Sequence, residues 1–470
     1  MKKKYSLLMT IMIAFLLVVV LSWIIPGGAF SSGVYAKGDV TPLGLGDLTK
    51  VPLWTFSTIF QFSLIFLVIG GFYGVLNKTG VYKELVEKTV KKFKKNSKIF
   101  LIITVASLAI ISSVMGGNTY LFILVPFLTT VLLKLGYGKK ASILATVGSL
   151  FVGTIGATYA FDVNGYVNYY LGQEVNAFVW YKIILLVLSS ALLIMFLIKW
   201  APKEEKAKEE EIPLLVEEKG KAKKSFVPLV VITVIGIIMA LVGTFSWSDM
   251  YGTDLFTNLH SGITEFTIFG YPILANIMGT IYAIGNWSTQ DVNVILIVCS
   301  LLIGWIYSIK FKDLLDSFLE GAKEMLPVFL YATLTNIVIV ILMNSSTGNF
   351  INYTIINYLY GLSDSFNALI HGLVVGVDSF FVNFFPYMSS DVLNITTYFY
   401  TDATTYPVIG LITQAVYGLV MYVFPTSLLL VAGLAYQKVS YKEWLKYIWK
   451  YLLYLLAIIV AIVIIALSFI

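Results

Sequence analysis

The sequence predicts an all-α, polytopic membrane protein built from two inverted repeats, and three observations lead to this prediction. Of the 470 residues, 58% are hydrophobic and only 12% are charged. Apolar stretches recur that are long enough to cross a hydrocarbon core of about 30 Å as helices. The 32 basic residues are all lysines, and they cluster between these stretches. Because lysine-rich loops mark the cytoplasmic side, the clusters give each connecting segment a side.

The first half begins in the cytoplasm, where the lysines at positions 2–4 place the N-terminus. The apolar run that follows is longer than the core of a signal peptide, so we interpret it as a retained first helix. Eight lysines at 78–98 place that amphipathic segment in the cytoplasm as well. The crossing segments expected in this half are residues 7–25, 56–76, 141–161 and 180–200.

The segment 99–133 does not fit a simple crossing. It is apolar but broken at 115–119, and Lys134, Lys139 and Lys140 follow it. With lysines at both ends, the chain must enter the membrane and return to the same face. The sequence therefore predicts either a re-entrant hairpin or a short pair of helices here.

Between the halves lies a charged linker at 201–225, expected to be polar and mobile. Residues 226–246 then cross outward. The stretch 247–291 contains no lysine, which fits the exterior. Within it, residues 266–284 are apolar but interrupted by glycine and proline, so we expect an interfacial or buried element there.

The second half repeats the pattern in mirror image. Its crossing segments are residues 292–309, 324–343, 406–435 and 451–470. The apolar segment 365–385 is interrupted at Gly376, Asp378 and Asn383 and is followed by Pro386. If it crossed fully, the lysine cluster that begins at Lys438 would lie outside. A hairpin that enters from the exterior keeps those lysines in the cytoplasm.

The two halves are thus expected to be five-element units of opposite orientation, an arrangement typical of secondary transporters. Each contains a re-entrant hairpin and a broken helix. The expected domains are a first transmembrane repeat, a cytoplasmic charged linker, a connecting helix with an exterior segment, and a second transmembrane repeat, at residues 1–200, 201–225, 226–291 and 292–470.

Breaks inside apolar segments are the predicted binding positions, because non-helical backbone at membrane depth survives only in protein or beside a cavity. The breaks are expected at residues 116–119, 148–162, 376–391 and 414–427. The candidate solute- or ion-binding side chains at these breaks are Asn118, Thr119, Thr158, Asp162, Asp378, Asn383, Ser389, Ser390, Asp391, Thr426 and Ser427.

Three of these candidates are carboxylates and none is a lysine, which favours a cationic partner such as H⁺, Na⁺ or an ammonium group. The chain has no arginine for a bidentate anion clamp, although helix N-termini could still bind an anion. In the alternative interpretation, Asp162 and Asp391 cap exterior loops and the glycines serve packing. The aromatic residues are expected in lipid-facing and interfacial belts.

Other classes of site have little support. Cys299 is the single cysteine, and His260 and His371 are far apart, so the sequence contains no metal-spacing motif and predicts no cofactor. The net charge of +6 comes from lysine-rich loops. It therefore favours contact with anionic lipid headgroups over nucleic acid.

Four segments of the chain resemble the YfcC/DcuC group of anaerobic C4-dicarboxylate-type carriers. They are Leu-Ser-Trp-Ile-Ile-Pro-Gly-Gly-Ala-Phe at 21–30, Ile-Gly-Gly-Phe-Tyr-Gly-Val-Leu-Asn-Lys-Thr-Gly at 69–80, Phe-Leu-Glu-Gly-Ala-Lys-Glu-Met-Leu-Pro at 318–327, and Pro-Thr-Ser at 425–427 with the basic tail that follows. The resemblance implies a secondary transporter of the ion transporter superfamily with inverted repeats, two hairpins and elevator-type motion.

Members of this group are associated with C4-dicarboxylates or, in the YfcC branch, with exchange of basic amino acids. Asn383, Pro425, Thr426 and Ser427 match the family pattern. The chain departs from it at the first hairpin, where Gly-Asn at 117–118 replaces a frequent Glu-Glu pair, and at the first broken helix, where Thr-Tyr-Ala-Phe at 158–161 replaces Asn-Pro-Phe. The second hairpin lacks the usual glycines.

We therefore predict an antiporter or ion-coupled symporter of a small polar organic solute in the plasma membrane, with H⁺ or Na⁺ as the coupling ion. The acids at the breaks favour a basic or zwitterionic amino acid over a dicarboxylate. The expected partners are this solute and membrane lipid, and homodimerisation is left open. The alternatives are a C4-dicarboxylate carrier, a channel, a membrane-embedded enzyme and a scaffold without transport.

Overall fold

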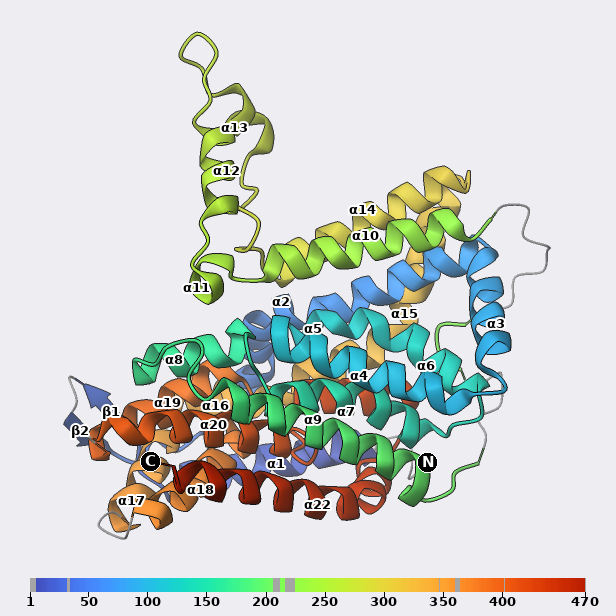
Figure 1. The fold of residues 1–470 in the computed structure, drawn as a ribbon. Coiled ribbons are helices and arrows are strands. Elements are labelled where there is room, and N and C mark those ends of the chain that lie inside the picture. The colour runs from blue at the N-terminus through green and yellow to red at the C-terminus, as the bar shows by residue number, and fades with distance from the viewer. Residues whose placement is uncertain are drawn as a thin grey trace.

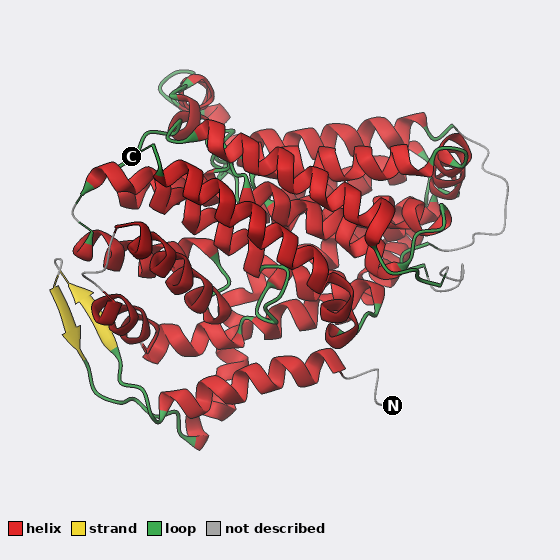
Figure 2. Cartoon of the chain, turned by 60° about the horizontal axis from the view of Figure 1, so that its bottom comes forward, coloured by secondary structure: helices red, strands yellow, loops and turns green. Residues whose placement is uncertain are grey.

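The computed structural model describes residues 6–31, 34–205, 212–215, 225–345, 347–359, 364–400 and 402–469, and these are mostly helical (Figures 1 and 2). One feature corrects the all-α prediction. Strands β1 (Gly28–Ser31) and β2 (Val34–Lys37) pair antiparallel with Gly28 opposite Lys37. This hairpin follows α1 and lies between the expected crossing segments 7–25 and 56–76.

In the first half the polar breaks divide the apolar sequence into helices of very different length. These helices are α1 (Ser6–Ser22), α2 (Leu45–Lys78), α3 (Val81–Phe93), α4 (Ser97–Met115), α5 (Asn118–Leu121), α6 (Val125–Lys134), α7 (Lys139–Ile155), α8 (Tyr166–Leu171) and α9 (Val179–Met195). A 3₁₀ turn at Phe122–Leu124 joins α5 to α6, so that α4 and α5–α6 form a helical pair around Gly116 and Gly117.

The helices after the linker also differ widely in length. They are α10 (Val227–Thr244), α11 (Trp247–Tyr251), α12 (Leu255–Thr264), α13 (Ile273–Met278), α14 (Thr289–Ile306), α15 (Phe311–Thr335), α16 (Ile337–Ser345), α17 (Thr347–Leu359), α18 (Asp364–Phe381), α19 (Phe385–Phe399), α20 (Tyr406–Val420), α21 (Leu428–Gln437) and α22 (Tyr441–Leu467). Helices α18 and α19 form the second helical pair.

Eight described segments are long and apolar enough to cross a membrane. They are Leu45–Lys78, Ser97–Met115, Val179–Trp200, Val227–Thr244, Thr289–Ile306, Phe311–Leu342, Ala403–Val420 and Tyr441–Leu467. Helix α4 is among them, although it is one arm of the first predicted hairpin. Helices α1 and α7 have 17 residues each and are shorter than the predicted crossings there.

Helices α2 and α15, one from each half, pack along each other through glycines. A Cβ atom on Gly74 would lie 2.1 Å from the carbonyl oxygen of Ser317, and one on Gly321 would lie 2.1 Å from that of Gly70. Small residues allow helix backbones to approach closely where no side chain can fit between them. The two halves therefore meet at a tight helix crossing.

Helices α11, α12 and α13 form an arm that projects from the helical body (Figure 1). No side chain of α12 or α13 is buried, and Phe269, between them, is fully exposed. Of the two alternatives expected for residues 266–284, the buried element is therefore wrong, and the interfacial element stays a prediction. The apolar residues of this arm find too few neighbours within the chain to be covered.

The described part of the linker is docked, which contradicts the expected mobility for those residues. Glu204 accepts hydrogen bonds from the backbone N–H groups of Lys140 and Ala141 at 3.1 and 2.8 Å, at the first turn of α7. Leu214 is 2% exposed. Its carbonyl oxygen accepts a hydrogen bond from Asn77 Nδ2, and its N–H donates one to Glu324 Oε2, both at 2.9 Å. A carboxylate at a helix N-terminus and a buried leucine explain this docking.

The helix breaks are shorter than the sequence suggested. Helix α7 runs through Gly148 and Gly153, where the missing side chains leave room for Tyr422 and Ser112. Helix α18 runs through Gly376 and Asp378. These glycines allow close packing and do not interrupt the helix.

Within the four predicted breaks, the stretches that are not helical are residues 116–117, 156–160, 382–384 and 421–427. One further break, at Asn336 between α15 and α16, was not predicted.

Candidate functional site

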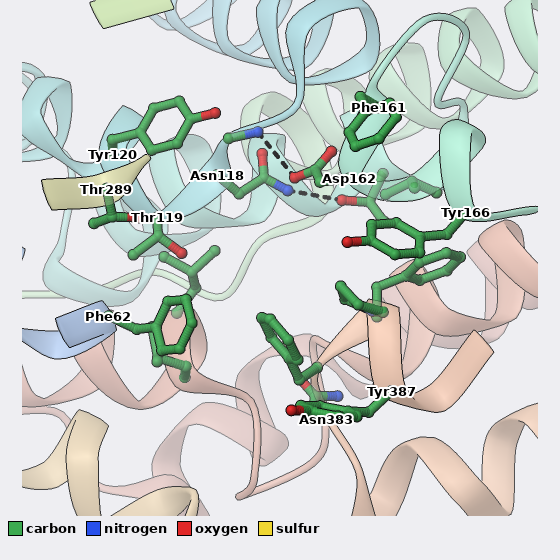
Figure 3. A pocket seen from close by; sticks show the side chains of 18 of the residues that line it. Phe62, Asn118, Thr119, Tyr120, Phe161, Asp162, Tyr166, Thr289, Asn383 and Tyr387 are labelled. Carbon is green, nitrogen blue, oxygen red and sulfur yellow. Dashed lines mark hydrogen bonds between the residues drawn. The ribbon is translucent and has the colours of Figure 1, made fainter. Parts of the chain in front are cut away.

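The helix breaks of both halves meet at one cavity of about 510 Å³ (Figure 3). Its wall includes the tip of the first helical pair, the break after α7, the tip of the second pair, the break before α21, and parts of α2, α10, α14 and α16. Of the predicted site residues, the cavity wall contains Asn118, Thr119, Asp162 and Asn383. Figure 3 shows Asn118 and Asp162 on one side and Asn383 on the opposite side.

The tip of the first pair depends on two consecutive glycines. Gly116 and Gly117 have φ angles of +67° and +66°, a backbone conformation that side chains disfavour. A Cβ atom on Gly116 would lie 2.0 Å from Asp162 Oδ1. The Gly117 N–H donates a hydrogen bond of 2.9 Å to Asp162 Oδ2. The Asp162 carboxylate is thus held against the tip by backbone that only glycine can provide.

Asn118 connects the same tip to α4 and α7. Its Oδ1 accepts a hydrogen bond from Ser112 Oγ at 2.6 Å. Its Nδ2 donates to Thr154 Oγ1 at 2.9 Å, a bond drawn in Figure 3. With these bonds the amide is fixed in one orientation. Asn118 therefore presents a rigid polar surface to the cavity.

The tip of the second pair contains Asn383, which is 5% exposed and donates through Nδ2 to the carbonyl oxygen of Ser379 at 3.2 Å. Pro386 lies in the first turn of α19, where its missing N–H is not needed for helix hydrogen bonds. The proline therefore starts a helix, and the break is confined to residues 382–384.

Several predicted site residues lie behind the cavity wall. Thr158 Oγ1 donates to the carbonyl oxygen of Ser113 at 3.1 Å. Thr426 Oγ1 donates to the carbonyl oxygen of Phe380 at 2.7 Å and so joins the two breaks of the second half. Ser427 is fully buried, directly before the wall residues Leu428 and Leu429.

The other four candidates are not at a break at all. Ser389, Ser390 and Asp391 lie within α19, because that helix starts at Phe385, and Asp378 lies within α18. None of the four contributes to the cavity wall. The alternative interpretation of Asp162 and Asp391 as exterior loop caps does not hold for Asp391, which is in mid-helix, or for Asp162, which contacts the tip of the first pair.

The cavity wall is mostly apolar and carries little charge. Asp162 is the one formally charged side chain among the described residues that line it. The N-termini of α19 and α21 also reach the wall at Phe385 and Leu428, and neither N-cap residue caps its own helix through its side chain. Helix N-termini carry partial positive charge, although in α19 the N–H groups of Tyr387 and Met388 already bond to the carbonyl oxygen of Phe384. The same cavity thus offers an anionic group and two electropositive helix ends.

Lys182 is a buried basic residue close to the first break, where the sequence predicted acids and no base. It is 2% exposed, and its Nζ donates to Asn164 Oδ1 at 2.5 Å. Asn164 in turn donates to the carbonyl oxygens of Thr158 and Val175 at 2.7 and 3.1 Å. Lys182 therefore supports the first break from behind without lining the cavity. No pattern in the sequence predicts this contact, since Lys182 lies in an apolar segment far from the predicted break.

Aromatic residues line the cavity as well, which corrects their assignment to lipid-facing belts alone. The wall includes Phe62, Tyr120, Phe161, Tyr166, Phe384, Phe385, Tyr387 and Tyr417. Most of them are close in sequence to a tip or a break, and this proximity is the signal that could have identified them. Asn336, at the unpredicted break, is a further polar wall residue that sequence reasoning missed.

The apolar helices, with a cavity that several helix breaks reach, define a multi-pass membrane protein. The profile of the DcuC family, described as C4-dicarboxylate anaerobic carrier, matches residues 1–468. The chain belongs to this family. It is accordingly a member of a carrier family, and a carrier binds a small-molecule solute.

Two further similarities are more distant. The chain is 23% identical to an uncharacterized protein of Haemophilus influenzae over 307 residues, which are 63% of this chain. The match spans about half of that relative, 54% of its length. The YdaH transporter of Alcanivorax borkumensis superimposes with a TM-score of 0.43 and 10% identity over 98% of both chains.

Proposed function

We propose that the protein is a secondary active carrier for a small organic solute that bears both an ammonium group and a carboxylate. In this proposal Asp162 binds the ammonium group, and the N-termini of α19 and α21 bind the carboxylate. Asn118, Thr119 and Asn383 complete the site with hydrogen bonds. A basic or zwitterionic amino acid is the class of solute that fits this set.

The observation that carries the proposal is the position of Asp162 in a cavity whose other polar groups are neutral. A carboxylate without a basic neighbour in the wall favours a cation there. Its hydrogen bond from the Gly117 N–H satisfies part of its acceptor capacity, and its Oδ1 is buried without a hydrogen-bond partner. Helix N-termini that face the same space favour a carboxylate.

An inverted repeat with elevator-type motion is the transport mechanism that we infer. Two helical pairs with tips at one cavity support it, as does the packing of α2 on α15 through glycines from both halves. In this view α2 and α15 belong to a static scaffold. The pairs α4–α6 and α18–α19 enter from opposite faces and move together with the cavity. The repeats would comprise residues 1–200 and 292–470.

The proposed orientation places the N-terminus in the cytoplasm and the protein in the plasma membrane, because the lysine clusters lie in the segments assigned to that side. A homodimer in contact with membrane lipid is part of the same proposal. The exposed apolar faces of α10 and α14 support a lipid or subunit contact there.

A C4-dicarboxylate is the second candidate solute, and two observations favour it. The family to which the chain belongs is described as a carrier of C4-dicarboxylates. The N-termini of α19 and α21 provide two electropositive ends for two carboxylates. In that case Asp162 would be protonated or would face a coupling cation.

Counterflow in proteoliposomes distinguishes the two candidates. Purified protein is loaded with unlabelled L-lysine, L-serine or succinate, and entry of the same labelled compound is followed. We expect counterflow of an amino acid, strongly reduced in Asp162→Asn and unchanged in Asp402→Asn, which neutralises an exposed carboxylate outside the cavity. If only succinate shows counterflow, and Asp162→Asn does not reduce it, the solute is a C4-dicarboxylate and the amino-acid proposal is wrong. No counterflow with any of the three probes would contradict both.

A further inference from the structure

A buried carboxyl group lies outside the cavity, in the second helical pair. Asp378 is 1% exposed, and its Oδ1 accepts a hydrogen bond of 2.6 Å from Asn352 Nδ2 on α17. Its other oxygen, Oδ2, is buried and has no hydrogen-bond partner. An ionised carboxylate with a single neutral donor is very unfavourable in such a place.

Asn352, the partner of Asp378, also has a side-chain oxygen that lacks a hydrogen-bond donor. This residue is 0% exposed, and its Oδ1 is also buried without a partner. An amide has one acceptor oxygen and one donor nitrogen, and here only the nitrogen is used. Two buried oxygens on two hydrogen-bonded side chains are therefore both left without a hydrogen. One proton on Asp378 Oδ2 would convert that atom into a donor, with Asn352 Oδ1 as the acceptor of the same amide.

Among the residues that the structure describes, none on the helices packed against α18 supplies a positive charge for Asp378. The chain contains no lysine between residues 324 and 437, a stretch that includes α16, α17, α19 and α20, all packed against α18. The carboxyl group of Asp391 on α19 interacts with Asp378 and repels its negative charge. His371, on α18 itself, is engaged with Thr396 and Thr413 at 3.1 and 2.8 Å.

The titratable groups on the remaining neighbours face other partners. Tyr353 on α17 stacks on Tyr35 with ring centroids 3.8 Å apart. Tyr417 on α20 packs against the ring of Phe385. Lys37 on β2 lies over the ring of Phe350 at 5.6 Å. Each of these groups contacts a partner other than Asp378. A proton is therefore the simplest means of neutralising the Asp378 carboxylate.

Asp378 is also connected to the cavity. Its carbonyl oxygen accepts the hydrogen bond of 2.7 Å from the Val382 N–H, at the start of the break that carries Asn383. Thr426 fixes the intervening turn through the carbonyl oxygen of Phe380. A change of charge at Asp378 therefore acts one helical turn away from the cavity wall.

We propose that Asp378, paired with Asn352, binds and releases the proton that is coupled to solute transport. The proposal rests on the proposed carrier function and adds the coupling ion to it. Asp378 is neutral while α17, α18 and α19 are packed as in this structure. Release of the proton leaves a buried charge beside Asp391 and drives the second helical pair out of this packing.

The first experiment needs no solute. Infrared spectra of the purified full-length protein reveal protonated carboxyl groups by their separate C=O stretch. We expect such a band at neutral pH, missing in Asp378→Asn, altered in Asn352→Ala and unchanged in Asp402→Asn. An identical band in Asp378→Asn would overturn the proposal. So would a band that disappears when Na⁺ is added at constant pH, because a metal cation would then replace the proton.

The second experiment measures coupling with L-lysine, L-serine and succinate as probes. Asp378→Asn is isosteric with the neutral acid, so it should retain counterflow but lose accumulation driven by a pH gradient. Accumulation that persists in this variant would overturn the proposal. If no probe shows counterflow in the wild-type protein, the proposed carrier function fails, whereas the infrared result still decides whether Asp378 holds a proton.

Discussion

The backbone N–H of Gly117 donates a hydrogen bond of 2.9 Å to Asp162 Oδ2. This bond joins the tip of the first helical pair to the break that follows α7, although the two residues are 45 positions apart in sequence. The one formally charged side chain of the described cavity wall is therefore positioned by backbone from another element. Movement of the tip and binding at Asp162 are consequently linked.

The first prediction concerns the glycine tip. In Gly116→Ala the new Cβ would lie 2.0 Å from Asp162 Oδ1, and φ is +67°. The tip must then move away from Asp162, so we expect counterflow to be lost while the protein remains folded. Gly172→Ala is the matched control, because φ is +60° there but no heavy atom lies within 4 Å. Equal activity of the two variants in the counterflow assay would contradict this account of the tip.

The second prediction concerns the contact between the halves. In Gly74→Ala the Cβ would lie 2.1 Å from a backbone oxygen of α15, which cannot move without displacing the helix. We expect a loss of about 1–3 kcal/mol in unfolding free energy, the usual effect of overpacking. Gly46→Ala, on the same helix with nothing within 4 Å, should not be destabilised. Thermal unfolding in detergent measures both, and a Gly74→Ala protein as stable as Gly46→Ala would show that α2 and α15 do not cross this closely.

The third prediction concerns Lys182. Lys182→Met keeps the length of the buried side chain but removes the donor to Asn164 Oδ1. An unsatisfied buried acceptor costs about 1–3 kcal/mol. We expect a lower melting temperature and weaker solute binding, because Asn164 also holds the carbonyl oxygen of Thr158. Lys199→Met, at an exposed position one helix length away, is the control. If both variants melt like the wild-type protein, Lys182 does not support the break.

The sequence was sufficient for the long apolar helices and for the general position of the cavity, because hydropathy and the lysine clusters depend on local composition. Asn118, Thr119, Asp162 and Asn383 were identified for the same reason, since each is at or beside a polar interruption of an apolar run.

Other features depend on contacts between distant segments and could not be predicted. Gly148 and Gly376 resembled helix breaks, but α7 and α18 continue through them, and at Gly148 the missing side chain leaves room for Tyr422. Pro386 resembled an interruption, but it starts α19. The roles of Lys182 and Asn352 become visible only when Asn164 and Asp378 are placed beside them.

The central claim is that the two helical pairs enter the membrane from opposite faces and meet at the cavity. Accessibility of single cysteines to a membrane-impermeant maleimide in intact cells tests it most directly, in a background with Cys299→Ala. We predict that Asp364→Cys and Asp402→Cys, which bracket the second pair, are both labelled from outside. Lys95→Cys and Lys134→Cys, which bracket the first pair, should be labelled only after permeabilisation. Labelling of Asp364→Cys and Asp402→Cys from different faces would contradict the claim.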